Sequence, residues 1–351
     1  MELLYNTLAN IGDIDKKAGQ AAQNRLDSLT KPPGSLGILE KIAVQIASIQ
    51  GEPLPVLGKK VVMIMAADHG VVAEGVSAFP QEVTTQMVYN FLNQGAAINV
   101  LSRHVNARVV ITDVGIAAKP INHPNLNVCK VRSGTRNMAK EAAMTAAETV
   151  TAIETGISLV NQEIDDGATL IATGEMGIGN TTSSSAILAC FSGRDIALIV
   201  GRGTGLNDQG LRIKQNVINK ALEVNQPDPA NPLDVLSKVG GLEIAALTGV
   251  ILGAAARKIP VVLDGFISTA AALTAFKLNE DSRKYMLASH LSQEPGHKIM
   301  LDLMDMQPML QLDLRLGEGT GAVLAFNLIE AAVKIMHEMA TFAEAGVSNK
   351  E

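Results

Sequence analysis

The sequence predicts an α/β protein whose doubly wound, mostly parallel sheet is flanked by helices. Runs of β-branched and apolar residues alternate with segments in which apolar residues recur at helical spacing. Unbroken apolar runs are typical of strands buried on both faces, as in parallel sheets. Four of the runs end in glycine, acidic or hydroxyl residues, and open α/β sheets bind ligands at such strand ends. The expected strands are residues 61–67, 109–114, 169–173, 260–263 and the alternating run 311–315.

Length and composition limit the class of protein. The 351 residues suffice for a large core and about two domains, and 47% hydrophobic against 18% charged residues exclude a disordered chain. Without Trp and with 3% aromatic residues, the core must consist mainly of aliphatic residues and the 14 Met. A net charge of -6 argues against a nucleic-acid-binding surface, although a small anionic ligand remains possible.

Cysteine usage and apolar runs bear on the location of the protein. Cys129 and Cys190 are far apart and form no C-x-x-C pattern, which indicates space-filling thiols in a reducing cytosol. The N-terminus lacks the basic and then apolar order of a signal peptide. The longest uncharged apolar run, residues 244–256, is too short to span a bilayer. We therefore expect a cytoplasmic protein without a membrane partner.

The first part of the chain is predicted to be helical, followed by the first strand. Residues 1–29 fit helices, and Ser35, after a proline-rich turn, is placed to cap a helix with an apolar face over 36–49. The first strand ends in Asp68-His69-Gly70, which should face the crevice, although His69 also fits a hydrogen-bonded structural role. A helix over 81–92 follows, with Phe79 and Met87 as candidates for the lining of an apolar slot.

Two loops in the middle of the chain have the composition of anion sites. Residues 132–137 contain two arginines, although such a loop is more often simply solvated, and a long helix over 141–164 follows. Residues 174–182 form the better cradle, because a glycine-rich loop and a hydroxyl-lined helix start supply backbone N–H donors. Their spacing matches neither G-x-G-x-x-G nor G-x-x-x-x-G-K-[ST], and no loop typical of phosphoribosyl pyrophosphate binding is present.

The next segment supplies a second glycine loop. Residues 201–208 precede a helix from which Lys214 would reach a phosphate, although an exposed lysine on the helix surface is the commoner case. A proline-rich surface loop and two further helices are expected over 225–258. The strand 260–263 ends in Asp264 and precedes a helix over 267–276. His290 and His297 lack the spacing of metal ligands, so no metal or other cofactor is expected.

Glu318 is the candidate reactive base. It stands among Gly317, Gly319 and Gly321, between the strand-like run 311–315 and a helical pattern over 322–339. The glycines allow a close approach of backbone to ligand, and a helix start favours anions. On this motif alone, Glu318 fits a simple helix cap equally well. The strand ends also contribute carboxylates at Asp68, Glu175 and Asp264, which fits a nucleotide or sugar phosphate bound for acid/base chemistry.

Six motifs in this order resemble the nicotinate-nucleotide:5,6-dimethylbenzimidazole phosphoribosyltransferase family over nearly the whole chain. They are Lys31-Pro32-Pro33-Gly34-Ser35-Leu36-Gly37, Ala67-Asp68-His69-Gly70-Val71, Gly174-Glu175-Met176-Gly177-Ile178-Gly179-Asn180-Thr181-Thr182, Asp234-Val235-Leu236-Ser237-Lys238-Val239-Gly240-Gly241, Leu263-Asp264-Gly265-Phe266 and Arg315-Leu316-Gly317-Glu318-Gly319-Thr320-Gly321-Ala322. Six ordered motifs are far more specific than any one of them.

The resemblance implies roles for individual residues. Glu318 matches the general base, Glu175 a second acid and Lys214 the phosphate-contacting lysine, and Ser292 lies in the phosphate-side loop. The other positions that match the nucleotide site are Gly177, Gly179, Asn180, Thr181, Gly203, Asp264, Gly265, Gly317 and Thr320. The base pocket matches Phe79, Met87 and Leu316, and some relatives carry serine and glutamine at the first two positions, so a more apolar pocket is expected here.

The resemblance also implies a reaction and an architecture. The reaction is transfer of the 5-phosphoribosyl group from nicotinate mononucleotide to dimethylbenzimidazole or a similar base, with inversion at C1′. The architecture is a homodimer of Rossmann-like chains, with a large α/β domain over 30–310 and a small helical domain from 1–29 and 311–351. Two alternatives are a nicotinamide-dependent dehydrogenase, whose G-x-G-x-x-G motif is missing, and a nucleotide sensor that releases no nicotinate. The sequence leaves the identity of the acceptor base open.

Overall fold

A six-stranded parallel sheet forms the centre of the molecule in a computed structural model that describes residues 1–203 and 205–348. The strands lie in the order β3-β2-β1-β4-β5-β6, and every neighbouring pair is parallel. Their bounds are Lys59–Ala67 (β1), Arg108–Gly115 (β2), Leu126–Val128 (β3), Ala168–Met176 (β4), Val261–Leu263 (β5) and Met286–Ala288 (β6). The order reverses between β1 and β4, and ligands bind at such a switch point in doubly wound sheets. The predicted fold class is confirmed.

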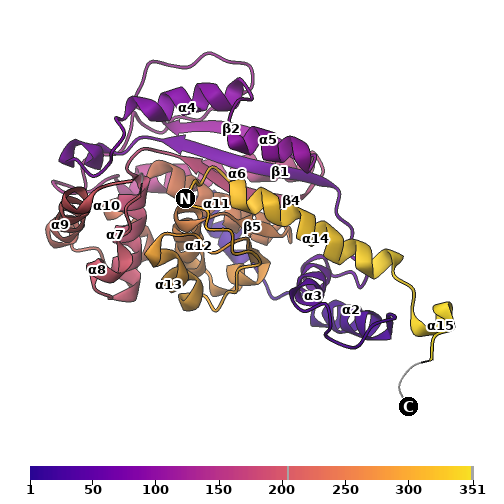
Figure 1. The fold of residues 1–351 in the computed structure, drawn as a ribbon. Coiled ribbons are helices and arrows are strands. Elements are labelled where there is room, and N and C mark those ends of the chain that lie inside the picture. The colour runs from indigo at the N-terminus through magenta and orange to yellow at the C-terminus, as the bar shows by residue number, and fades with distance from the viewer. Residues whose placement is uncertain (204, 349–351) are drawn as a thin grey trace.

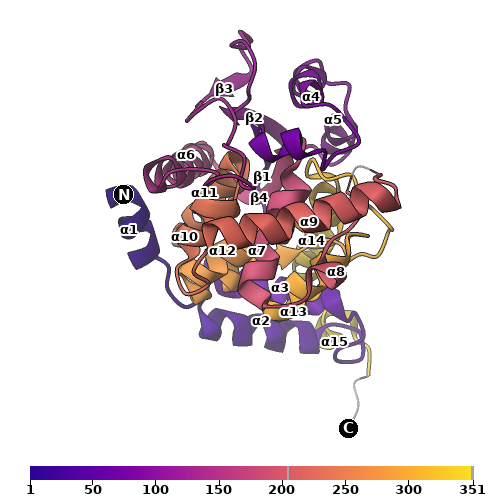
Figure 2. The same ribbon diagram turned by 90° about the vertical axis from the view of Figure 1, so that its left-hand side faces the viewer.

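Helices cover both faces of the sheet and bury two separate cores. Along β1, Val61, Met63 and Met65 pack into one core, and Val62, Ile64 and Ala66 pack into the other. This alternation explains the unbroken apolar run, because a strand buried on both faces has no polar side. The first face carries α6 (Ala146–Asp165), α7 (Asn180–Ser192), α11 (Leu242–Ala256) and α12 (Phe266–Leu278). The second carries α3 (Ile38–Gln50), α4 (Glu82–Leu92), α5 (Ala97–His104) and α14 (Thr320–Glu338). Figures 1 and 2 show α4 and α5 beside β1 and β2, opposite α6 and α11.

The remaining elements are short or peripheral. They are α1 (Glu2–Ala9), α2 (Lys16–Ser28), α8 (Ile196–Ile199), α9 (Asp208–Asn225), α10 (Pro232–Val239), α13 (Pro295–Leu303), α15 (Phe342–Ala345) and the 3-10 helices η1 (Gly70–Glu74) and η2 (Glu280–Tyr285). The predicted pair of helices around Gly240 and Gly241 is confirmed as α10 and α11.

Three details of the sequence prediction are wrong. Residues 311–315 form no strand, because their backbone meets the segment after β6 in isolated hydrogen bonds, such as that from the Gln293 N–H to the Leu314 carbonyl oxygen. Ser35 does not cap α3, whose N-cap is Gly37 without a side-chain hydrogen bond. The helix expected from residue 141 begins at Ala146, where Thr145 and Glu148 form a capping box. The short strands β3 and β6 were not expected.

The two ends of the chain meet beside the sheet. α2, α3 and α14 pack on one another, and a bridge between Leu29 and Thr341 joins the ends. Figure 1 shows α14 running from the sheet toward α2, α3 and α15. The first helix differs, because α1 packs on α6 and α11. The division into domains 30–310 and 1–29 plus 311–351 stays a prediction.

Among the described residues, one helix is long and apolar enough to cross a membrane by length and composition, and that helix is α14. Its side chains Phe326, Ile329, Val333 and Met336 are buried in the second core. Helices in the interior of a globular protein pass the same test, and this burial accounts for the composition of α14.

Candidate active site

A cavity of about 640 Å³ opens at the carboxyl ends of β4, β5 and β6. Loops after three strands and the extended segment before α14 form its walls. Most of the predicted site residues line it, namely Phe79, Met87, Glu175, Gly177, Asn180, Thr181, Gly203, Asp264, Gly265, Ser292, Leu316, Gly317 and Glu318. The structure therefore brings together residues from segments that are distant in sequence.

Glu318 lies in this cavity on a sharply turned backbone. Its φ is 63°, and those of Gly317 and Gly319 are 82° and 91°, so three consecutive residues are left-handed. Glycine adopts this conformation without strain, whereas glutamate does not. The turn packs against β4, where a Cβ on Gly174 would lie 2.8 Å from the Glu318 carbonyl oxygen. Close packing against the sheet thus holds Glu318 at the start of α14.

The Glu175 carboxylate contacts the backbone of Glu318, and both residues are buried. Glu175 Oε1 accepts the Glu318 backbone N–H at 3.3 Å, and Glu175 Oε2 accepts the Asn180 side-chain amide. Burial raises the pKa of Glu318 to about 7, and the negative charge of Asp264 contributes. Burial and Asp264 likewise raise the pKa of Glu175 to about 8. Among the described residues, Glu318 Oε2 is buried without a hydrogen-bond partner, so it can accept a proton from a ligand.

The alternative that Glu318 merely caps α14 is wrong. The N-cap is Gly319, and the carboxylate that accepts the first N–H groups belongs to Asp264. Asp264 Oδ2 accepts the N–H of Gly319 at 3.0 Å, and Oδ1 accepts those of Gly321 and Ala322 at 2.8 and 3.1 Å. Asp264, at the end of β5, therefore caps α14, and the Glu318 carboxyl group is not used for capping.

The other end of the cavity has the donors of a phosphate site. Thr181, in the first turn of α7, accepts a 2.7 Å hydrogen bond from Lys214 Nζ on α9. Lys214 is fully buried, so the alternative of an exposed surface lysine is wrong. Burial lowers its pKa to about 8, although the nearby Glu294 carboxylate opposes the change. Gly203 donates its N–H to Glu294 Oε1 at 3.0 Å. Of the predicted loop 201–208, Thr204 lies outside the described residues.

Five apolar side chains line part of the same cavity. This apolar wall consists of Phe79, Val83, Met87, Ile178 and Leu316. Phe79 is 50% and Leu316 54% exposed, so this slot opens to solvent. A flat aromatic ring would fit such a wall, with a carboxyl group at its edge. Val83 and Ile178 were not predicted; Val83 stands one helical turn before Met87, which is the signal that would have identified it.

Three predicted site residues lie behind the cavity surface. Lys214 contacts the lining through Thr181. Gly179, with φ 94°, packs over His69 and Val72 at the start of α7. Thr320 donates its hydroxyl to the Gly317 carbonyl oxygen at 2.8 Å and so fixes the turn around Glu318. These residues support the lining and do not form it.

Asp68 and His69 do not face the crevice, contrary to expectation. Asp68 Oδ2 accepts the Ala117 N–H at 2.7 Å. His69 is fully buried between Ser183, with Nδ1···Oγ at 3.1 Å, and Glu243, with Nε2···Oε1 at 2.5 Å. The segment around Gly177 covers the end of β1 so closely that a Cβ there would lie 2.5 Å from the Ala67 carbonyl oxygen. The structural interpretation of His69 is therefore the correct one.

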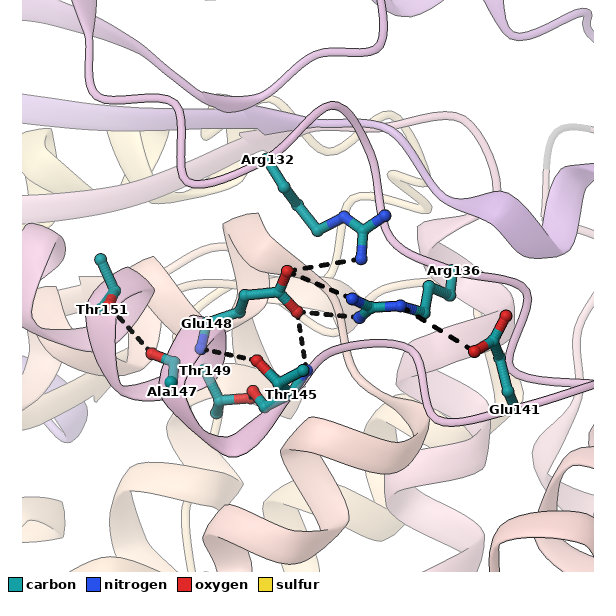
Figure 3. A network of polar contacts seen from close by, with 8 residues as sticks. All are labelled: Arg132, Arg136, Glu141, Thr145, Ala147, Glu148, Thr149 and Thr151. Atoms are coloured by element: carbon teal, nitrogen blue, oxygen red, sulfur yellow. Dashed lines mark hydrogen bonds and ion pairs between the residues drawn. The ribbon is translucent and has the colours of Figure 1, made fainter.

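The arginines of the loop 132–137 are engaged with carboxylates. Arg136 Nη1 donates to Glu148 Oε2 at 2.8 Å and Arg136 also pairs with Glu141, and Arg132 Nη1 contacts Glu148 Oε1 at 3.4 Å. Figure 3 shows both guanidinium groups turned toward Glu148 at the start of α6. Neither arginine lines the cavity. This loop stabilises the helix start, and the prediction of an anion site there finds no support.

The site can now be compared with known proteins. A family model described as phosphoribosyltransferase matches residues 11–347, almost the entire chain. The chain belongs to the phosphoribosyltransferase family. A nicotinate-nucleotide--dimethylbenzimidazole phosphoribosyltransferase from Desulforamulus reducens is 59% identical over 349 residues and covers 99% of both chains. A protein with the same name from Chloroflexus aggregans is 55% identical over 351 residues, or 100% of this chain and 99% of its own.

A solved structure agrees with this assignment. The crystal structure of CobT from Thermus thermophilus matches with a TM-score of 0.92 and 48% identity, over 95% of this chain and 100% of its own. The chain is thus a pentosyltransferase. In this phosphoribosyltransferase, the cavity at the carboxyl ends of β4 to β6 has a raised-pKa carboxyl at one end and a buried lysine near the other.

Proposed function

We propose that this phosphoribosyltransferase transfers the 5-phosphoribosyl group of nicotinate mononucleotide to 5,6-dimethylbenzimidazole or a similar base. The products are α-ribazole 5′-phosphate and nicotinate, with inversion at C1′. The observation that carries the proposal is the position of Glu318, whose pKa is raised to about 7, in one cavity with an apolar wall and the Thr181–Lys214 pair. The names of relatives at 59% and 55% identity support the same substrates.

Glu318 acts as the general base. Its unpartnered Oε2 accepts the N–H proton of the benzimidazole, while the other ring nitrogen attacks C1′ of the ribose. The bond from C1′ to the nicotinate nitrogen breaks on the opposite face, so the β-glycosidic bond becomes α. Positive charge develops on the ring as the new bond forms, and a buried carboxylate stabilises that charge. Holding both rings beside the ribose contributes a further part of the acceleration.

The remaining lining residues bind and orient the substrates. Thr181, Gly203 and Ser292 bind the phosphate, and Lys214 contributes its positive charge from behind Thr181. Glu175 fixes the Glu318 turn through the N–H that it accepts. Phe79, Met87 and Leu316 contact the acceptor base. Because this wall offers few polar groups, we expect a preference for apolar rings over purines.

The enzyme works as a homodimer in the cytoplasm under this proposal. Phe79 and Leu316 line the cavity yet are about half exposed, and Leu312, on the same extended segment as Leu316, is 48% exposed. Large exposed apolar groups around a binding site are typical of a surface that a partner covers. A second copy of the chain would cover them and close the slot.

One assay tests the reaction. The enzyme is incubated with nicotinate mononucleotide and dimethylbenzimidazole, benzimidazole, adenine or phenol, each in turn. Nicotinate release is followed by chromatography, and the anomeric configuration of the product by NMR. We expect release that depends on the base, fastest with dimethylbenzimidazole, and an α-configured product. Binding of nicotinate mononucleotide without release in any mixture would indicate a nucleotide sensor, and a β-configured product would contradict inversion.

A further inference from the structure

Asp264 joins the end of β5 to the start of α14 through three hydrogen bonds. Its two carboxylate oxygens accept the N–H groups of Gly319, Gly321 and Ala322 at 2.8 to 3.1 Å. The side chain is 2% exposed, so water does not compete for these donors. Although Asp264 lines the cavity, its carboxylate is already committed to α14. A direct contact with the nucleotide is therefore not its main role.

These bonds change the environment of Glu318, which directly precedes Gly319. The start of a helix carries partial positive charge and lowers the pKa of a carboxyl group beside it. A carboxyl group with a lowered pKa is a weak base at neutral pH. Here the N–H donors point at Asp264, whose negative charge offsets the helix end. In the part of the chain that the structure describes, Glu318 Oε2 has no partner, which agrees with donors that are already occupied.

We infer that Asp264 is a positioning residue. By accepting the N-terminal N–H groups of α14, it fixes the Glu318 turn and keeps the Glu318 carboxylate a strong proton acceptor. The inference rests on the proposed role of Glu318 as the base. The same three bonds also hold Gly319 in its left-handed conformation, with φ 91°, directly after Glu318. The position and the proton affinity of Glu318 thus both depend on the side chain of Asp264, at the end of β5.

Other charged groups lie near the Glu318 turn. Glu175 faces it from β4, and His290 faces it from the segment after β6. Arg315 belongs to the segment before Glu318 and is exposed, while Lys214 and Glu294 lie toward the phosphate end. Burial lowers the pKa of His290 and so favours its neutral form, although Asp264 opposes this. Of these groups, Asp264 is the one whose carboxylate contacts the helix start.

The test is a direct titration of Glu318. Protein labelled with ¹³C at glutamate carboxyl groups is titrated by NMR, and the resonance that Glu318→Gln removes is assigned to Glu318. We expect a midpoint near 7 in the wild type and a midpoint about one to two pH units lower in Asp264→Asn. Asparagine has the same shape, but only its carbonyl oxygen can accept N–H groups, so the variant removes the charge and one of the two oxygens that bind the start of α14. The acid limb of the transfer activity should move to lower pH by the same amount.

Asp113→Asn is the matched control. Asp113 is also a buried aspartate at a strand end, where Oδ1 accepts the N–H groups of Gly115 and Ile116, but it does not line the cavity. Its replacement should leave the Glu318 midpoint unchanged. An unchanged or higher midpoint in Asp264→Asn overturns the inference. If that variant does not fold, the wild type decides: a midpoint at or below the ordinary glutamate value of about 4.5 overturns it, and one near 7 supports it. The titration requires no turnover, so failure of the proposed reaction remains a separate result.

Discussion

Glu318 is a non-glycine residue with positive φ at a candidate active site, and that conformation has an energetic cost. A left-handed backbone costs an ordinary residue about 1 to 2 kcal/mol. The cost is tolerated because Gly174 lets the turn approach β4 and Glu175 binds the Glu318 N–H. Strain of this kind concentrates where function requires a fixed side chain. The backbone therefore supports a catalytic role for Glu318 independently of its pKa.

We expect Glu318→Gln to lower kcat by about 100-fold to 10,000-fold, because glutamine cannot accept the ring proton. The fold should persist, since the two side chains have the same shape and the Glu175 contact uses the backbone N–H. Nicotinate release measures the loss, and circular dichroism checks the fold. Near-normal turnover in a folded variant would rule out Glu318 as the base.

Lys214→Met should raise KM for nicotinate mononucleotide by about 10-fold to 100-fold, with a smaller change in kcat. Methionine fills the buried volume but removes the charge that binds the phosphate. Initial rates over a range of nucleotide concentrations give both constants. Lys220→Met is the control, because Lys220 is an exposed lysine on the same helix and should leave KM unaltered. Equal effects of both variants would contradict a role of Lys214 in phosphate binding.

The pH profile of kcat/KM should be bell-shaped and narrow. Below about pH 7 Glu318 is protonated and cannot accept a proton, and above about pH 8 Lys214 loses the charge that holds the phosphate. Burial also raises the pKa of Glu175, to about 8. Rates measured from about pH 5 to 10 locate the limbs. In Lys214→Met the alkaline limb should disappear; its persistence would assign that limb to another group.

At the scale of elements, the packing of α6 against α11 brings two helix backbones unusually close. Gly156 on α6 and Gly249 on α11 have no room for a Cβ, because backbone atoms of the opposite helix occupy that space. Glycine is a poor helix former, so its presence here follows from the close approach. The contact supports β1 and β4, on which α11 packs.

Gly249→Ala should therefore destabilise the fold by about 2 kcal/mol or more, since the methyl group would meet the backbone of Ile153. Urea denaturation followed by circular dichroism measures the change. Gly12→Ala serves as the control, because nothing lies within 4 Å of its added Cβ, and its stability should stay close to that of the wild type. Equal stability of both variants would show that α6 and α11 can move apart freely.

At the scale of the whole molecule, the open cavity makes assembly testable. We expect light scattering after size exclusion to give twice the chain mass of 36.9 kDa. The physical reason is the exposed apolar surface of Phe79, Leu312 and Leu316 at and beside the cavity, which a second copy would remove from water. A single-chain mass at micromolar concentration would contradict the homodimer and leave the slot open to solvent.

The sequence by itself determined the sheet, most helices and the clustering of glycine turns at strand ends. Periodicity and turn chemistry are local, so residues 61–67 or 322–339 indicate their structure without a partner. A similar local pattern gave a wrong prediction at 311–315, where polar and apolar residues alternate in a segment without neighbouring strands. The strand order β3-β2-β1-β4-β5-β6 could not be predicted, because the pairing of strands that are distant in sequence leaves no local signal.

The tertiary structure alone decided which carboxylates are available for chemistry. Asp68, Asp264 and Glu318 have similar sequence settings, each within two residues of a glycine and near a predicted strand end. In the folded protein, Asp68 binds the Ala117 N–H outside the cavity and Asp264 binds the start of α14, whereas Glu318 lines the cavity without capping α14. His69 hydrogen-bonds to Glu243, 174 residues away, and lies outside the crevice. Hydrogen bonds between distant residues depend on how the layers pack, and only the packed molecule contains that information.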